Sequence, residues 1–313
     1  MDDQNAPIQS LLLHGSAIAE ADVPAYRDVL DVLRAAEVTL AFTSGFHKAI
    51  SDMGLGGPQD LACELHSAGG YGMVLTFGGD GTVLETAGQL AGQPIPVLGI
   101  NTGRLGFLSH LPMPESARVL PSILNGAYKV EQRAMLQVDF PNAELGSNLR
   151  ALNEITVHRR DVASMIRVSV SRNGVFVNRY WSDGLIVSTP TGSTAYSLSC
   201  GGPIIHPDSN AIVLNPIAPH NLYDRPVVIP LEGTLEIEAE GRDDHLMLTI
   251  DRRSYKVAAP ARFTVQPAER PFMLVQLPGV DFIETVRRKL HLGLDAREGH
   301  SMEGGQETGP NPR

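Results

Sequence analysis

The segment 74–85 holds the residues with the clearest chemical potential in this chain. Residues 74–77 read as a buried strand, the turn Gly78-Gly79-Asp80-Gly81-Thr82 follows directly, and a helical pattern begins after it. Glycines on both sides of Asp80 remove the Cβ atoms that keep a ligand off the backbone. The N–H groups at the start of the helix can then meet an anion. A carboxylate among phosphate-binding amides holds a metal ion or takes a proton from a hydroxyl, so the segment indicates phosphoryl transfer.

A simpler interpretation of this turn remains open. Gly-Gly-Asp-Gly also suits a tight connection from strand to helix, in which the helix dipole favours Asp80 near the N-terminus. The position of the turn argues for function, because ligands of open parallel sheets bind outside the carboxyl ends of the strands.

Two further segments carry polar groups at positions where strands begin or end. The loop 101–107 follows the next strand, so its amides, Thr102 and Arg104 are expected beside the glycine turn as phosphate ligands. Asn153 and Glu154 stand together at the start of an apolar strand. Adjacent strand residues face opposite ways, so both reach one pocket only if a bulge intervenes.

The block from Ser188 to Thr194 is dense in hydroxyl groups. Six of its seven residues are Ser, Thr or Gly, which suits sugar hydroxyls and phosphate oxygens. Ser193 or Thr194 is also expected to cap a short helix that Gly201-Gly202 closes. The sequence therefore predicts both helix capping and ligand binding here.

Composition limits the partners of the chain. The 313 residues carry a net charge of −10, which argues against a nucleic-acid partner because such a partner needs a basic face. Cys63 and Cys200 fit no metal-ligand spacing, which favours a reducing cytoplasm. We find neither an apolar leader nor a run that could span a bilayer. We expect a soluble, cytoplasmic protein with no membrane partner.

The order of predicted elements indicates an α/β domain followed by an all-β domain. Strands are expected at 8–14, 38–43, 72–77 and 97–100, alternating with helices at 23–36, 58–68, 82–91 and 115–124, which is typical of a parallel sheet. From residue 127 the pattern becomes short alternating strands, at 152–159, 165–170, 175–181, 185–188, 212–216, 227–230, 234–239, 246–250, 262–266 and 272–277. These strands predict an antiparallel sandwich of two sheets.

Four parts of the chain follow from this reading. They are an α/β nucleotide-binding domain at 1–126, a β-sandwich domain with dinucleotide-binding loops at 127–280, a helix at 281–295 that packs back on the first domain, and a disordered tail at 296–313.

Taken together, these segments resemble the NAD kinase family over about residues 8 to 293. The glycine turn alone is shared with diacylglycerol-type lipid kinases and phosphofructokinases, whereas the block from Asp183 to Pro207 is more specific. The resemblance implies transfer of the γ-phosphoryl group of ATP to the 2′-hydroxyl of the adenosine ribose of NAD, with Mg²⁺ or another divalent ion. It also implies a homodimer or homotetramer.

The resemblance also implies roles for single residues. Asp80 is expected as the general base or as the group that orients the 2′-hydroxyl, while Asp183 is expected to reach the ligand of an adjacent subunit. The residues expected to line the NAD site are Asp80, Gly81, Phe107, Asn153, Glu154, Asp183, Thr194, Ala195, Tyr196, Ser197, Leu198 and Ser199. The residues expected to bind ATP phosphates are Gly78, Gly79, Thr82, Thr102 and Arg104. Asp251-Arg252-Arg253 departs from the Asp-Gly-Gln-like turn expected in relatives, and receives no role.

Two alternatives use the same residues. A soluble diacylglycerol-type lipid kinase shares the glycine turn but needs an apolar pocket for acyl chains, which the hydroxyl-rich block disfavours. A non-catalytic NADP-binding sensor needs no acid, so the intact Asp80 argues against it.

Overall fold

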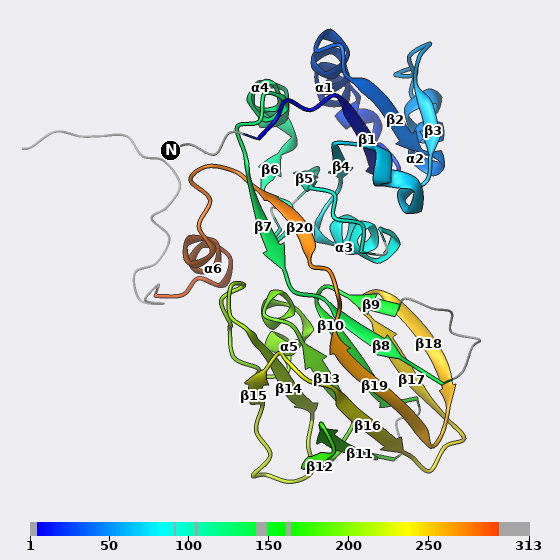
Figure 1. Ribbon diagram of the computed structural model, residues 1–313, viewed down its shortest axis with the longest axis vertical. Helices are drawn as coiled ribbons and strands as arrows, with labels where there is room; N and C mark the ends of the chain where they lie inside the picture. Colours follow the sequence, from blue (N-terminus) through cyan, green and yellow to red (C-terminus); the bar gives the residue numbers. More distant parts are fainter. Residues whose placement is uncertain (1–4, 91, 104–105, 142–148, 161–163, 294–313) are drawn as a thin grey trace, which may run out of the picture. The chain divides into compact units, whose positions relative to one another are not determined.

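The computed structural model describes residues 5–90, 92–103, 106–141, 149–160 and 164–293, in two compact units. The first unit, Met1–Pro278, contains an α/β part and an all-β part, as expected from the sequence (Figure 1). The second unit begins at Gly279 and contains helix α6, Phe282–Leu290, whose first turn is capped by the Asp281 side chain. Its expected return to the first domain stays a prediction, and the expected tail at 296–313 lies outside the described residues.

The α/β part is built on an eight-stranded sheet whose main path runs β3-β2-β1-β4-β5-β20-β7, with β6 paired to β5. Its strands are β1 Ser10–Gly15, β2 Thr39–Thr43, β3 Leu61–Cys63, β4 Met73–Phe77, β5 Val97–Asn101, β6 Leu111–Pro112, β7 Lys129–Arg133 and β20 Phe272–Gln276. All neighbouring pairs are parallel except β20 with β7. Because β4 and β5 are parallel neighbours, the loops that follow them leave the same edge of the sheet.

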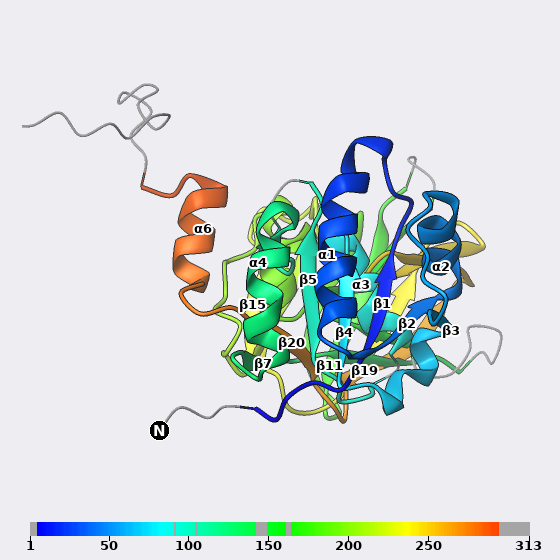
Figure 2. The same ribbon diagram turned by 90° about the horizontal axis from the view of Figure 1, so that it is seen from above.

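Helices cover both faces of this sheet because its strands are apolar on both sides. The helices are α1 Val23–Ala35, α2 Ser44–Asp52, α3 Asp80–Gln89 and α4 Met113–Leu124. Alternate residues of the strands divide between two cores: Leu11, Leu13 and Leu75 pack with α1, α2 and α4, whereas Leu12 and Val74 pack with α3. Figure 2 shows α1, α2 and α4 together on one side of the sheet.

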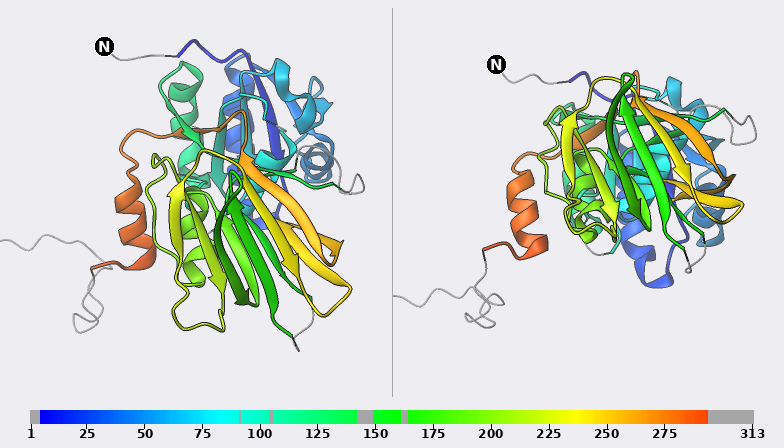
Figure 3. Two further views of the ribbon diagram at one scale, coloured as in Figure 1. Left: turned by 60° about the horizontal axis from the view of Figure 1, so that its bottom comes forward. Right: turned by 90° about the horizontal axis from the view of Figure 1, so that it is seen from below.

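The all-β part consists of two six-stranded antiparallel sheets, ordered β15-β14-β13-β10-β17-β18 and β12-β11-β16-β19-β8-β9. Figure 3 shows strands of the all-β part in the foreground. The strands of the first are β10 Glu154–Arg159, β13 Gly184–Ser188, β14 Ala211–Ile217, β15 Val227–Pro230, β17 His245–Ile250 and β18 Arg253–Ala258. Those of the second are β8 Leu136–Asp139, β9 Leu149–Ala151, β11 Ile166–Arg172, β12 Val175–Ser182, β16 Leu235–Glu240 and β19 Ala261–Pro267. Residues from both sheets form one buried cluster, which confirms the expected sandwich.

One predicted element of the α/β part is wrong, and one helix is absent from the prediction. The helix expected at 58–68 is instead the short strand β3 followed by the 3-10 turn Leu65–Gly70, while helix α2 precedes it unpredicted. Phe46 and Ile50, four residues apart, are the buried side chains of α2, and a single helical repeat with Gly45 beside it gives little sequence signal. β3 has only three residues, too few for an alternating pattern to be recognised. It is a strand because it pairs with β2, and local periodicity does not predict that pairing.

The strand expected at 272–277 also belongs elsewhere. The alternating pattern predicts it as part of the sandwich, whereas β20 pairs with β5 and β7 in the first sheet. The buried side chains of Phe272 and Leu274 join the core under α3, which explains why this strand completes the α/β part. The chain therefore passes from one part to the other between β7 and β8 and returns between β19 and β20.

Candidate active site

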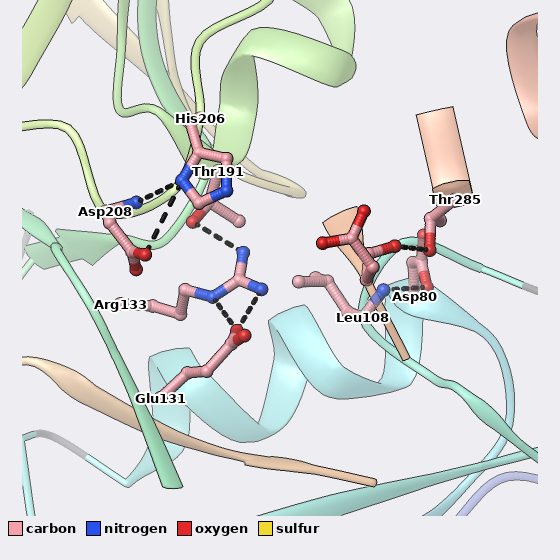
Figure 4. A network of polar contacts seen from close by, with 9 residues as sticks. Asp80, Leu108, Glu131, Arg133, Thr191, His206, Asp208 and Thr285 are labelled. Atoms are coloured by element: carbon pink, nitrogen blue, oxygen red, sulfur yellow. Dashed lines mark hydrogen bonds and ion pairs between the residues drawn. The ribbon is translucent and has the colours of Figure 1, made fainter. Parts of the chain in front are cut away.

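Asp80 occupies the first position of helix α3, directly after strand β4 and the N-cap residue Gly79. Its carboxylate accepts three backbone hydrogen bonds from the loop that follows β5. Phe107 N donates to Oδ2 at 2.7 Å, while Leu108 N and Ser109 N donate to Oδ1 at 2.9 and 3.2 Å. The Ser109 hydroxyl adds a longer bond of 3.4 Å to Oδ1. The two predicted loops therefore meet at one carboxylate (Figure 4).

Gly106 makes this approach possible. A Cβ on Gly106 would lie 1.6 Å from Asp80 Oδ1, so any side chain there would displace the carboxylate. On the same loop, Thr102 is partly exposed and the Asn101 side chain accepts from Gly103 N at 2.8 Å. Arg104 lies outside the described residues.

Asp80 keeps acceptor capacity despite these bonds. An ionised carboxylate offers about four lone-pair positions, and Oδ1 takes the larger share of the donors found here. Oδ2 accepts one N–H among the described residues, which leaves a position for a hydroxyl. The carboxylate can therefore hold the loop at residues 107–109 and orient a substrate hydroxyl at the same time.

A second carboxylate, Asp251, binds successive amides in the all-β part. It lies in the two-residue turn between β17 and β18 and accepts from Leu152 N and Asn153 N at 2.8 Å each, and from Glu154 N at 3.2 Å. The bulge suggested for Asn153 and Glu154 is not needed, because β10 begins only at Glu154 and Asn153 lies in the bend before it. Because Asn153 lies outside the strand, its side chain and that of Glu154 need not point to opposite faces. The hydrogen bonds to Asp251 hold the backbone of both residues in place.

Glu154 and Asp251 line a cavity of about 450 Å³ in the all-β part. Two other residues expected at the dinucleotide site, Asp183 and Tyr196, line the same cavity. Asp183 forms an ion pair of 2.9 Å with Arg159, another lining residue, and Tyr196 is 46% exposed. The cavity thus brings together residues from three segments of the chain that the sequence analysis singled out separately.

Two acids in this cavity have raised pKa values. Burial raises the pKa of Glu154 to about 8, with a further contribution from the negative charge of Asp251 and an opposing hydrogen bond from the Tyr196 backbone. Burial likewise raises the pKa of Asp251 to about 6, although the three amides and Arg253 oppose the shift. At neutral pH the Glu154 carboxyl is therefore largely protonated, and it can donate as well as accept a hydrogen bond.

The hydroxyl-rich block forms a 3-10 turn, Thr191–Thr194, followed by the short helix α5, Tyr196–Ser199. The expected capping by Ser193 or Thr194 is wrong: the N-cap of α5 is Ala195, and both hydroxyls bond backbone carbonyls within the preceding turn. Ser193 also accepts from Ile205 N at 2.9 Å, which holds the two ends of the block together. Gly201, at φ +79°, follows the helix as expected.

The remaining predicted residues of this block divide between buried and accessible positions. Ser197 is buried against Asn215, whose side chain donates to its carbonyl and hydroxyl oxygens at 2.8 and 3.2 Å. Leu198 is half-buried, Ser199 is exposed, and Thr194 and Ala195 are half-buried. Ser197 is therefore committed to holding α5 on strand β14, whereas its neighbours stay accessible.

Two residues that hold the site together escaped the sequence analysis. The sequence pattern predicts no role for Asp251 and does not single out Arg133. Arg133 is buried at the end of β7, forms an ion pair with Glu131, and lies 3.5 Å from the Thr191 hydroxyl (Figure 4). A Glu-x-Arg pair on a strand could have indicated the ion pair of Arg133 with Glu131. Its contact with Thr191 joins residues 58 positions apart, which local sequence patterns cannot predict.

The described residues contain no group of three or more His, Cys, Asp or Glu side chains arranged to hold a metal ion. Both cysteines are free thiols. Among the described helices none is long and apolar enough to cross a membrane.

Comparison with known proteins gives consistent matches. Residues 51–128 match the family model described as the ATP-NAD kinase N-terminal domain, and residues 152–277 match the ATP-NAD kinase C-terminal domain. An NAD kinase of Cytophaga hutchinsonii is 36% identical over 287 residues, covering 91% of this chain and 98% of the relative. One of Flavobacterium johnsoniae is 35% identical over 291 residues, covering 92% and 99%.

Two solved structures share the fold, each at 24% sequence identity. Yeast NADH kinase complexed with NADH has a TM-score of 0.84, covering 95% of this chain and 91% of its own. An NAD kinase from Archaeoglobus fulgidus in complex with ATP has a TM-score of 0.72, covering 90% and 98%. With both domain models matched and relatives aligned over nearly their whole length, the chain belongs to the NAD kinase family.

Proposed function

We propose that this chain transfers the γ-phosphoryl group of ATP to the 2′-hydroxyl of the adenosine ribose of NAD and so makes NADP. In this step the 2′-oxygen forms a bond to the γ-phosphorus while the bond from that phosphorus to the bridging oxygen of ADP breaks. The hydroxyl proton passes to Asp80 and then to water. ADP and NADP leave as products.

The observation that carries the proposal is the setting of Asp80 in a chain of this family. Its carboxylate stands at the N-terminus of α3, where backbone amides and the helix dipole favour phosphate. The loop amides fix its orientation before any substrate arrives. Positioning of this kind supplies a large share of the rate in phosphoryl transfer, because the protein does little covalent chemistry.

The cavity of the all-β part is the proposed binding site for the dinucleotide. Asn153 and Glu154 would grip NAD from positions that Asp251 holds, and Tyr196 would close the side formed by α5. A protonated Glu154 suits this role, because it presents a hydrogen-bond donor without adding charge beside the diphosphate. Gly81, Phe107, Thr194, Ala195, Leu198 and Ser199 are proposed to complete the site.

The ATP phosphates are proposed to lie along the glycine turn, with Gly78, Gly79, Thr82 and Thr102 as ligands. The described side chains offer no ready set of ligands for a resident metal ion. We therefore assign Mg²⁺ to the substrate, as the Mg²⁺–ATP complex, in which it neutralises charge on the phosphates.

The chain is further proposed to act in the cytoplasm as a homodimer or homotetramer. Large apolar side chains stand exposed on the all-β part, among them Phe176, Trp181, Leu222 and Tyr223, at 50–89% exposure. A second copy of the chain would cover such side chains. The ion pair of Asp183 with Arg159 within one chain leaves the reach of Asp183 into a neighbouring subunit as a prediction.

One assay tests the activity. Purified protein is incubated with Mg²⁺–ATP and NAD, and the product is detected with an NADP-specific dehydrogenase, with a heat-inactivated sample as the control. NADP formed in step with ADP supports the proposal. Binding of NADP with no turnover would favour the sensor, and phosphorylation of diacylglycerol in place of NAD would favour the lipid kinase.

A further inference from the structure

Arg252 is an exposed cation in a turn whose backbone is held by hydrogen bonds. It follows Asp251 in the two-residue turn that joins β17 to β18, where Ile250 pairs with Arg253. The three amides bound by Asp251 pin this turn to the start of β10. The side chain of Arg252 therefore projects from a fixed point, although it is long and flexible itself.

The guanidinium of Arg252 lies over Gly81. A Cβ on Gly81 would stand 2.6 Å from Nη1 of Arg252, so glycine is the residue that lets the two come together. Gly81 belongs to the first turn of α3 and follows Asp80. A cation from the all-β part thus meets the helix N-terminus of the α/β part, and no hydrogen bond or ion pair of Arg252 is found within the described part of the chain.

The surrounding charges show why a cation is needed here. Arg252 shares a cavity of about 280 Å³ with two acids, Glu85 and Asp251, and with one other cation, Arg253, while Asp80 precedes the glycine that Arg252 covers. The Arg253 guanidinium is held elsewhere, because it donates to the Arg150 carbonyl. Phosphate groups that enter this region meet several carboxylates, which repel them. A guanidinium offers two parallel N–H donors to phosphate oxygens, an arrangement that suits a terminal phosphate better than a point charge does.

We infer that Arg252 is a phosphate-binding residue of the transfer site, which contacts the phosphoryl group as it becomes the 2′-phosphate of the product. The inference rests on the proposed function, because it places the reacting hydroxyl at Asp80. A phosphate on that hydroxyl lies next to Gly81, within the region that the guanidinium covers. NAD lacks this phosphate, so of the two dinucleotides bound alone only NADP makes the contact.

This difference between the dinucleotides predicts a specific pattern of kinetic change. A group that binds the transferred phosphate but not the free hydroxyl stabilises the transition state and the product more than the substrate. Its loss lowers kcat and the affinity for NADP, while the affinity for NAD is kept.

The test compares NAD and NADP binding in Arg252→Gln, Arg252→Lys and wild-type protein by titration calorimetry, alongside kcat and KM for NAD. Arg252→Gln is expected to weaken NADP binding about 10-fold or more, and to change NAD binding less than about 2-fold. Arg252→Lys should retain part of the NADP affinity. Lys256→Gln, an exposed charge loss on the same hairpin, is the matched control and should leave the ratio of the two affinities unchanged.

A second variant checks the contact itself. Gly81→Ala should displace the guanidinium, so that adding Arg252→Gln to it costs less NADP affinity than it does in the wild type. Equal weakening of NAD and NADP, or no change in either, would overturn the inference. Wild-type protein that binds NADP through Arg252 but forms none would overturn the proposed activity and leave the inference standing, and wild-type protein that binds neither dinucleotide overturns both.

Discussion

The α/β part and the all-β part each contain a carboxylate that accepts hydrogen bonds from three successive backbone amides. Asp80 holds residues 107–109 on the loop after the neighbouring strand, whereas Asp251 holds residues 152–154, nearly 100 positions earlier in the chain. The hydrogen-bond lengths are nearly the same for the two carboxylates, but their surroundings differ. Asp80 stands at a helix N-terminus, whereas Asp251 faces Glu154, whose pKa it helps to raise.

We propose that this difference separates a reacting group, Asp80, from a positioning group, Asp251. Amide binding fixes either carboxylate, so the hydrogen bonds alone cannot identify a catalytic acid. What distinguishes Asp80 is its place at the N-terminus of α3, where we propose that phosphate binds, while Asp251 is proposed to act through the residues that it holds. The variants below test that division, beginning with the largest expected effect.

Asp80→Asn should reduce turnover about 100-fold or more, because the amide cannot take the hydroxyl proton. It should also lower thermal stability, since its NH₂ group faces a backbone N–H that now has no acceptor. The measurements are kcat with NAD and the midpoint of thermal unfolding. Near-normal turnover in a folded variant would contradict the role of Asp80.

Asp251→Asn should raise KM for NAD about 10-fold and lower the free energy of unfolding by about 1–3 kcal/mol, because the start of β10 loses an anchor. Steady-state kinetics and urea unfolding measure the two effects. If kcat instead fell as far as in Asp80→Asn while KM stayed constant, the distinction between the two carboxylates would fail.

The pKa of Glu154 predicts a pH dependence of stability. Its folded value of about 8 lies above its ordinary value of 4.5, so between these values the folded chain keeps a proton that the unfolded chain has lost. The stabilisation is complete below pH 4.5, decreases as pH rises, and is gone above pH 8, a change on the order of a few kcal/mol. The pKa of Asp251 is about 6 in the folded chain against an ordinary value of 3.8, so Asp251 also stabilises the fold at low pH, over a lower pH range.

Glu154→Gln isolates this contribution, because glutamine cannot titrate. Urea unfolding of both proteins at several pH values should show the wild type losing stability relative to the variant as pH increases from 5 to 8. A wild type that gained stability relative to Glu154→Gln over this range would refute the assignment.

Ser109→Ala should have the smallest effect. Its hydroxyl makes the longest of the four hydrogen bonds to Asp80, and the backbone N–H of residue 109 is kept. We expect turnover to change less than about 3-fold and the free energy of unfolding to fall by at most about 1 kcal/mol. A loss comparable to Asp80→Asn would show that the hydroxyl, and not the amide set, positions the carboxylate.

Local patterns predicted the parts of the fold that depend on local chemistry. The strand, glycine turn and helix around Asp80 follow from apolar periodicity and from the need for bare backbone, and the sandwich follows from alternation. The pairing of β20 with β5 and the clamp of Asp251 depend on partners far away in the chain. The amides of residues 152–154 leave no sequence signal, since every residue but proline has one.

The position of β20 has a consequence for how the protein is made. This strand follows every described strand of the sandwich in the chain, yet it lies between β5 and the edge strand β7 in the first sheet. A nascent chain that ends before residue 272 exposes the edge of β5 and lacks Leu274, the partner of Val97. The α/β part therefore completes its sheet only after the whole sandwich has been synthesised, so that a truncated message yields an open edge prone to pairing with other chains.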